Sequence, residues 1–211
     1  MPKLVYFPLQ GRAQAIRFLL RSKGVAFEDE LLSFEEWGSV KAAATYGEGT
    51  QLPVWVCDDG TVLNQSIAIL KMLAEENGYA PENPKQRYES EWFYATIVDI
   101  LEKPERMAIM KDDATEEQKQ AAIDVFTRFL DKLNTHWADG RAHVAGDKVT
   151  DADFTLLSIV TGQLDNAGSK HAAIREATAA KLQSSENVLR VVAPMRELCA
   201  DQIAALAPCP I

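Results

Sequence analysis

The chain has 211 residues and a formal net charge of −9; 47% of the residues are hydrophobic and 25% are charged. These values are typical of a globular protein with one large or two small domains, and they exclude disordered and collagen-like classes. No block of Lys and Arg is present, which argues against binding to the phosphates of nucleic acids.

The three cysteines and three histidines form neither a C-x-x-C pair nor a pattern with metal-ligand spacing. We therefore expect reduced cysteines and no structural metal. Residues 1–9 lack the basic and apolar regions of a signal peptide, and no apolar stretch approaches the roughly 20 residues that span a bilayer. These features predict a cytoplasmic protein with no membrane segment.

Strand and helix patterns alternate along the first third of the chain. Short β-prone runs are bounded by Pro or Gly, and the longer runs place apolar residues at helical spacing. The predicted elements are strand 3–7, helix 12–23, strand 25–32, helix 34–44, strands 52–57 and 61–63 joined at Asp59-Gly60, and helix 66–77.

Residues 78–84 are rich in Gly, Pro and Asn, and the sequence after them shows only helical patterns. The predicted helices cover about 89–111, 115–137, 150–164, 170–182 and 186–198. The order predicts an α/β domain over residues 1–77, a linker over 78–84 and an all-α domain over 85–211.

Several residues permit a chemical interpretation beside a structural one. Tyr6 ends the first strand, where α/β folds place ligands, although a strand tyrosine is usually a packing residue. Ser66 begins a helix whose N-terminus suits a carboxylate, although it can act only as an N-cap. Pro53 starts a strand as an edge proline or as a cis proline that exposes backbone. Trp37 and Lys41, four residues apart, share a helix face where the Lys stem can cover the ring.

Thr150-Asp151-Ala152-Asp153 has a strong structural interpretation. Thr150 caps a helix and Asp153 returns a bond to the backbone, as in a capping box with Asp in place of Glu. Val149 and Phe154 can add a hydrophobic staple. We interpret this motif as a folding element and not as a metal or acid–base site.

In combination, these motifs resemble the cytosolic glutathione transferases of the tyrosine type, nearest the sigma, pi, mu and alpha classes. The resemblance spans residues from about 4 to 165, and the blocks around Gln65-Ser66 and Asp153 are the most specific. The blocks are Leu4-Val5-Tyr6-Phe7 with Gly11-Arg12-Ala13, Trp37 with Lys41, Gln51-Leu52-Pro53 with Asn64-Gln65-Ser66-Ile67-Ala68-Ile69, and Gly146-Asp147-Lys148-Val149-Thr150-Asp151-Ala152-Asp153.

The resemblance implies a thioredoxin-like first domain with a mixed four-stranded sheet, an all-helical second domain, and a homodimer. It implies that the Tyr6 hydroxyl bonds the sulfur of glutathione, with Arg12 nearby. The implied glutathione-binding residues are Gln65 and Ser66 for the γ-glutamyl end, Trp37 and Lys41 for the glycine carboxylate, Leu52 before a cis Pro53 for the cysteinyl backbone, and Asp99 for the ammonium across the dimer interface. Gln51, which precedes Leu52, is also implied to bind glutathione.

The chemistry of glutathione agrees with these implied roles. A helix N-terminus at Ser66 suits one of its two carboxylates, Lys41 suits the other, and Asp99 suits its ammonium. A free thiol has a pKa of about 8.5, and lowering it by about two units requires roughly 3 kcal/mol. A hydrogen bond to a charged group contributes about 1.5–3 kcal/mol, so Tyr6 aided by the positive field of Arg12 can supply most of this energy, and no cofactor besides the co-substrate is expected.

Two departures from the family pattern affect the site. Residues 47–50 lengthen the loop before Gln51, which leaves open whether Tyr46 inserts into a partner subunit. Lys103-Pro104 should kink the long helix that lines the electrophile pocket. The expected walls of that pocket are apolar, and Met suits variable ligands. They are Phe7, Leu9, Met107 and Met110.

The leading functional hypothesis is conjugation of glutathione to apolar electrophiles in detoxification. A glutathione-dependent isomerase or peroxidase using the same site is the second. A non-catalytic binding protein, as in lens crystallins of this fold, is the third, but the joint presence of Tyr6, Arg12, Gln65 and Ser66 argues against it.

Overall fold

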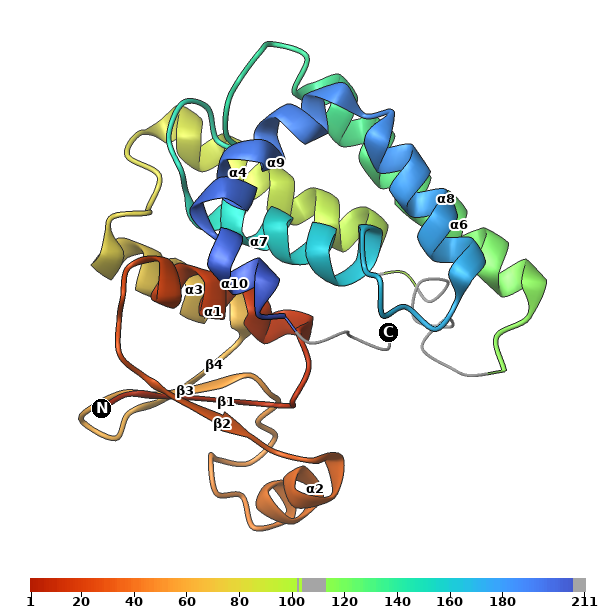
Figure 1. The fold of residues 1–211 in the computed structure, drawn as a ribbon. Helices are drawn as coiled ribbons and strands as arrows, with labels where there is room; N and C mark the ends of the chain where they lie inside the picture. The colour runs from red at the N-terminus through yellow and green to blue at the C-terminus, as the bar shows by residue number, and fades with distance from the viewer. Residues whose placement is uncertain (102, 104–112, 207–211) are drawn as a thin grey trace. The chain divides into compact units, whose positions relative to one another are not determined.

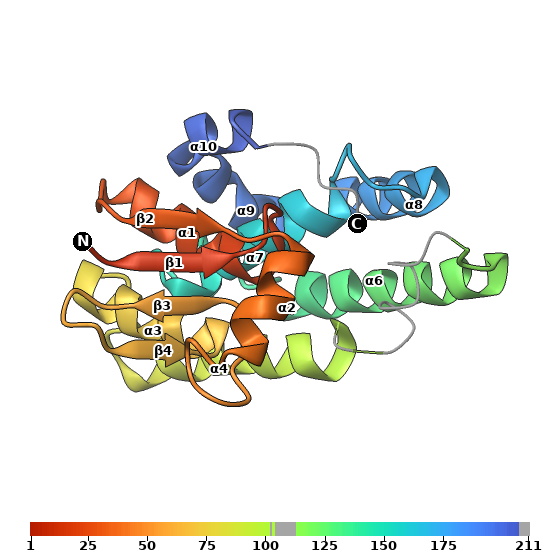
Figure 2. The same cartoon turned by 90° about the horizontal axis from the view of Figure 1, so that it is seen from below.

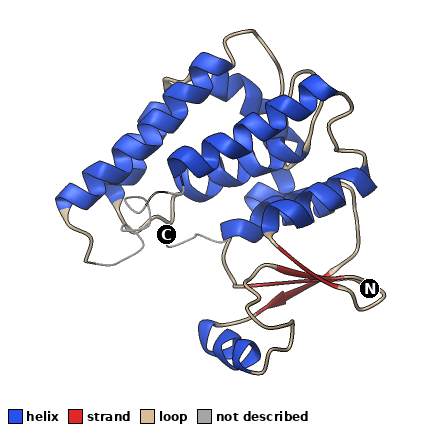
Figure 3. Cartoon of the chain, turned by 180° about the vertical axis from the view of Figure 1, so that it is seen from behind, coloured by secondary structure: helices blue, strands red, loops and turns tan. Residues whose placement is uncertain are grey.

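The fold is described from a computed structural model, which places residues 1–101, 103 and 113–206. The chain divides into two compact units, Met1–Ala80 and Pro81–Ile211. In Figure 3 the strands gather in the first unit, and the described part of the second is built from helices.

The first unit contains a mixed four-stranded sheet in the order β2-β1-β3-β4 (Figure 2). Strand β1 pairs in parallel with β2 and antiparallel with β3, which pairs antiparallel with β4. This confirms the predicted thioredoxin-like class. The elements are β1 Lys3–Tyr6, η1 Gly11–Ala13, α1 Gln14–Ser22, β2 Glu28–Leu31, α2 Phe34–Ala42, β3 Val54–Val56, β4 Val62–Asn64 and α3 Ser66–Asn77.

The two faces of this sheet carry different helices. Helices α1 and α3 lie together on one face, and α2 lies on the other (Figure 1). The first face buries Leu4 with Ile16 and Leu70, whereas Val5 points to the second face and packs with Trp37. This division follows from the alternation of side chains along β1.

The first predicted helix, 12–23, is two elements. A short 3₁₀ turn at Gly11–Ala13 precedes α1, which begins at Gln14. The inward positions Ala13, Ile16, Leu19 and Leu20 are all fully buried, as the helical spacing predicted. The predicted apolar face is therefore confirmed, and only the start of the α-helix differs from the prediction.

The described part of the second unit comprises α4 Pro84–Thr96, η2 Ile97–Leu101, α6 Glu116–His136, α7 Asp151–Ile159, η3 Val160–Leu164, α8 Ala172–Gln183, α9 Glu186–Leu198 and α10 Ala200–Ala204, where η2 and η3 are π-helical turns.

Helix α4 starts five residues before the predicted Glu89, because Asn83 accepts the Gln86 N–H (3.0 Å) and Pro84 occupies the first helical position. The predicted kink at Pro104 lies outside the described residues. No described helix has the length and apolarity to cross a membrane.

The Thr150–Asp153 motif holds the start of α7. Asp153 is fully buried, and its Oδ2 accepts bonds from the N–H (2.8 Å) and the hydroxyl (3.0 Å) of Thr150. Its Oδ1 accepts the N–H of Val144 (2.9 Å). Asp153 therefore returns a bond to the backbone, as predicted, and also fastens the preceding loop to the helix.

Candidate functional site

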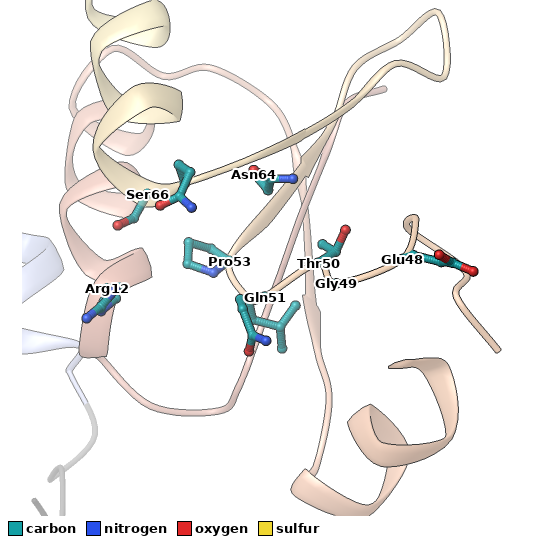
Figure 4. A pocket seen from close by; sticks show the side chains of 10 residues that line it. Arg12, Glu48, Gly49, Thr50, Gln51, Pro53, Asn64 and Ser66 are labelled. Atoms are coloured by element: carbon teal, nitrogen blue, oxygen red, sulfur yellow. The ribbon is translucent and has the colours of Figure 1, made fainter. Parts of the chain in front are cut away.

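One cavity of the first unit collects residues from three separate stretches of the chain (Figure 4). The stretches are the 3₁₀ turn, the loop that leads into β3, and the junction of β4 with α3. Six predicted site residues line it, namely Arg12, Gln51, Leu52, Pro53, Gln65 and Ser66. Four further lining residues were not predicted, namely Glu48, Gly49, Thr50 and Asn64.

The N-terminus of α3 lies at this cavity, but its cap differs from the prediction. Gln65 is the N-cap and Ser66 is the first helical residue, so Ser66 does not cap the helix. Gln65 makes no side-chain cap bond and has a φ of 72°, a conformation that is strained for a residue with a side chain. An uncapped first turn presents N–H donors and a partial positive charge. Strain of this kind is most often retained at functional sites.

The peptide bond between Leu52 and Pro53 is cis, in agreement with the expectation from the resemblance. Pro53 is buried directly before β3, and Leu52 is half-buried at the cavity. The backbone of Leu52 therefore lies beside the α3 terminus, where an extended peptide-like ligand can pair with it.

Tyr6 is the last residue of β1 and is 7% exposed. Its hydroxyl oxygen accepts the backbone N–H of Arg12 (3.1 Å). Gly11 makes this turn possible, because its φ is +42° and a Cβ there would stand 2.6 Å from Tyr6 Oη and 2.7 Å from Leu9 Cδ1. The Tyr6 hydroxyl is thus positioned by the turn whose Arg12 side chain lines the cavity.

Arg17 is a second cation near Tyr6 that the sequence interpretation missed. Its guanidinium carbon lies 5.8 Å from the centre of the Tyr6 ring, and its side chain is buried. Nε donates to both carboxylate oxygens of Asp29 (3.2 and 3.0 Å), and Nη1 donates to the carbonyl of Leu9 (2.8 Å). The sequence did offer one signal for it, namely an arginine on the apolar face of the predicted helix. A charge that is buried there needs an oppositely charged partner.

Trp37 and Lys41 do not line the cavity. Trp37 is 9% exposed and packs with Val5, Leu32 and Val54 beneath α2, and Lys41 is exposed. Of these two neighbours on α2, Trp37 therefore faces the core and Lys41 faces solvent. Their roles toward the glycine carboxylate stay predictions.

The lengthened loop adopts a defined conformation. Gly47 and Gly49 have φ values of 97° and 72°, and the Thr50 hydroxyl donates to the carbonyl of Tyr46 (2.9 Å). Tyr46 is half-buried against the Trp37 cluster, and burial together with Glu30 raises its pKa above the usual value. The loop thereby places Glu48 at the rim of the cavity.

The remaining predicted site residues lie in different parts of the chain. Leu9 Cδ1 and the Tyr6 hydroxyl both lie close to Gly11, and the ring of Phe7 lies 5.4 Å from that of Tyr6. Asp99 is exposed on η2 in the second unit. Met107 and Met110 lie outside the described residues.

Comparisons with known proteins identify the family of the chain. Residues 12–76 match the model of the glutathione S-transferase N-terminal domain. The chain is 34% identical over 159 residues to a glutathione S-transferase of Dirofilaria immitis, covering 74% of this chain and 73% of that one. It is 32% identical over 168 residues to the hematopoietic prostaglandin D synthase of Gallus gallus, covering 74% and 79%.

Solved structures share the fold over nearly the whole chain. A glutathione S-transferase from Ascaris lumbricoides has a TM-score of 0.78 at 24% identity and covers 99% of both chains. A monomeric glutathione S-transferase from Necator americanus has a TM-score of 0.77 at 21% identity, covering 98% of this chain and 97% of that one.

Proposed function

This chain belongs to the glutathione S-transferase family, and we propose that it joins the thiol sulfur of glutathione to electrophilic carbon atoms of apolar substrates. The observation that carries the proposal is the Tyr6 hydroxyl, which is held by the N–H of Arg12, a residue that lines a cavity together with the uncapped start of α3. A hydroxyl that accepts a bond from an amide is polarised toward stronger donation.

Tyr6 donates a hydrogen bond to the thiolate of bound glutathione. This bond stabilises the charged form of the thiol and lowers its pKa toward neutrality. The buried guanidinium of Arg17 lies over the Tyr6 ring and is held there by its ion pair with Asp29, which keeps the ring in place. The thiolate sulfur then attacks the electrophilic carbon, and the leaving group departs with the bonding electron pair. The reaction needs no resident cofactor.

The remainder of glutathione follows the cavity. The α3 terminus at Ser66 and Gln65 takes the γ-glutamyl carboxylate through its N–H donors. The backbone of Leu52 pairs with the cysteinyl residue, and Gln51 continues toward the glycine end, where Lys41 and Trp37 hold the second carboxylate. Support for this order comes from the lining residues, which run from Ser66 through Pro53 to Gln51 (Figure 4).

The test is an ultraviolet difference titration of the purified protein with glutathione across pH, which follows the absorbance of the thiolate. We expect the bound thiol to ionise about two pH units below the free thiol, whose pKa is about 8.5. Binding with an unshifted thiol pKa would indicate a carrier, and the absence of binding would contradict the proposed site.

We also propose a homodimer in which Asp99 of one subunit contacts the glutathione ammonium bound to the other. Support comes from η2, where Val98 is 53% exposed directly beside Asp99, so an apolar and an acidic side chain lie together at the surface. The monomeric relative from Necator americanus makes the oligomeric state a point to measure.

The Asp99→Ala variant should raise the KM for glutathione about threefold to tenfold, since it loses one charge-assisted bond at an exposed site. Steady-state kinetics with varied glutathione gives the KM, and analytical ultracentrifugation gives the oligomeric state. Glu117→Ala, which removes another exposed acidic side chain of the same unit, is the matched control. An unchanged KM, or a monomeric wild type, would reject the cross-subunit role.

A second candidate activity is glutathione-dependent isomerisation in the same site. It is favoured by the 32% identity to the prostaglandin D synthase of Gallus gallus. An isomerase regenerates glutathione, whereas a conjugating enzyme consumes it, so thiol titration during turnover separates the two.

Detoxification in the cytoplasm is the setting that we propose. Cys57 and Cys199 are free thiols in the described part of the chain, which fits a compartment kept reduced by glutathione.

A further inference from the structure

Two further aromatic rings continue from Tyr6 toward solvent. The centre of the Phe7 ring lies 5.4 Å from that of Tyr6 and 4.4 Å from that of Phe34. Phe7 is half-buried, whereas Phe34 is 72% exposed. A row of three rings therefore begins at the ring of Tyr6, the proposed catalytic residue, and ends at the exposed ring of Phe34.

The backbone holds Phe34 in this place. Phe34 is the first residue of α2, and Ser33 caps that helix by accepting the Glu36 N–H (3.1 Å). Glu36 returns a bond to the Ser33 N–H (2.7 Å), which completes a capping box on both sides of Phe34. The ring is therefore presented from a fixed helix terminus.

An exposed aromatic side chain does not by itself indicate a function, because single apolar residues are common on protein surfaces. Phe34 differs from Leu31, which is 51% exposed three residues earlier on β2. Leu31 lies on the face of the sheet opposite to Leu32, and Leu32 packs with Trp37 beneath α2. Phe34 is instead joined through Phe7 to the ring of Tyr6.

We propose that Phe34 is a specificity-determining residue that stacks on the planar aromatic part of the electrophile. The inference rests on the proposed function. Phe34 contacts the part of the substrate that does not react, so it favours aromatic over aliphatic electrophiles without activating the thiol. Aromatic pairs prefer offset or tilted contacts, and Phe34 is tilted by 31° against Phe7 while 72% of its surface stays exposed to such a partner.

The test compares two displacement reactions at saturating glutathione. With 1-chloro-2,4-dinitrobenzene, a C–S bond forms at the ring carbon and chloride leaves with the bonding pair; with iodomethane, a C–S bond forms at the methyl carbon and iodide leaves. In both, the thiol proton passes to solvent. Phe34→Ala should lower kcat/KM for the aryl chloride about 2- to 12-fold, the equivalent of one aromatic pair, and leave iodomethane unchanged.

Matched variants isolate the stacking contribution. Phe34→Leu keeps an apolar side chain and should behave like Phe34→Ala, whereas Phe34→Trp should preserve the preference for the aryl chloride. Leu31→Ala, the loss of another exposed apolar side chain, should leave both reactions unchanged.

Three results would overturn the inference while leaving the proposed function in place. They are equal losses for both electrophiles in Phe34→Ala, wild-type behaviour of Phe34→Leu, and a changed sedimentation coefficient with an unchanged electrophile ratio, which would assign the ring to a contact between subunits. A wild-type protein that conjugates neither electrophile would contradict the proposed function itself.

Discussion

Replacing Tyr6 by Phe is expected to lower the turnover number about ten- to a hundredfold while glutathione still binds. The variant removes only the hydroxyl, which accepts the Arg12 N–H and which we propose donates to the thiolate. A hydrogen bond to a charged group contributes about 1.5–3 kcal/mol, and each 1.36 kcal/mol corresponds to a factor of ten. The proposed binding contacts at Ser66 and Leu52 are not altered by the variant, so the loss is expected in the chemical step.

Two measurements check this expectation. Steady-state kinetics gives the turnover number, and ultraviolet titration of bound glutathione should show its thiol pKa rising by about one to two units. Tyr79→Phe is the matched control, because it removes a phenol hydroxyl that contacts Ser22 Oγ (3.3 Å) in the same unit. Turnover that survives in Tyr6→Phe, with an unshifted thiol pKa, would remove Tyr6 from the mechanism.

Replacing Asp153 by Ala is expected to have the largest effect on stability. The fully buried carboxylate accepts two bonds from Thr150 and one from Val144, and all three donors become buried without this acceptor. Removal of one partner of a buried charged network costs about 3–5 kcal/mol. Because native domains are stable by only about 5–15 kcal/mol, this loss is a large fraction of the total.

Urea denaturation followed by circular dichroism measures the free energy of unfolding. Asp124→Ala is the control, since its exposed carboxylate on α6 accepts a bond from the Gln120 side chain at the surface, and the change should stay within about 0.5 kcal/mol. Equal stabilities of the two variants would show that the α7 cap is dispensable.

Local sequence patterns predicted most element positions because the groups that end a helix lie close to it in the chain. The Thr115–Gln118 capping box begins α6, and Gly78 ends α3 in the left-handed conformation. The start of helix α4 was predicted five residues too late, because Asn83 and Pro84 also suit a linker, whereas here they are the N-cap and the first residue of the helix.

The candidate site was predicted only in part from the residues themselves. Tyr6, Pro53 and Ser66 each had an ordinary structural explanation. Only their joint resemblance to a known family favoured a chemical role for them. The cis bond at Pro53 and the backbone bond from Arg12 to Tyr6 are then visible only in the folded chain.

By itself, then, the sequence determined the order of strands and helices, the buried faces of α1 and α3, and the family to which the chain belongs. The tertiary structure decided that Gln65 rather than Ser66 caps α3, that Arg17 lies over Tyr6, that Trp37 is a core residue, and that Phe34 ends a row of rings. Periodicity and caps act between residues a few positions apart. Left-handed backbone, ring contacts and burial of an ion pair depend on packing between segments that meet only when the sheet and its helices are assembled.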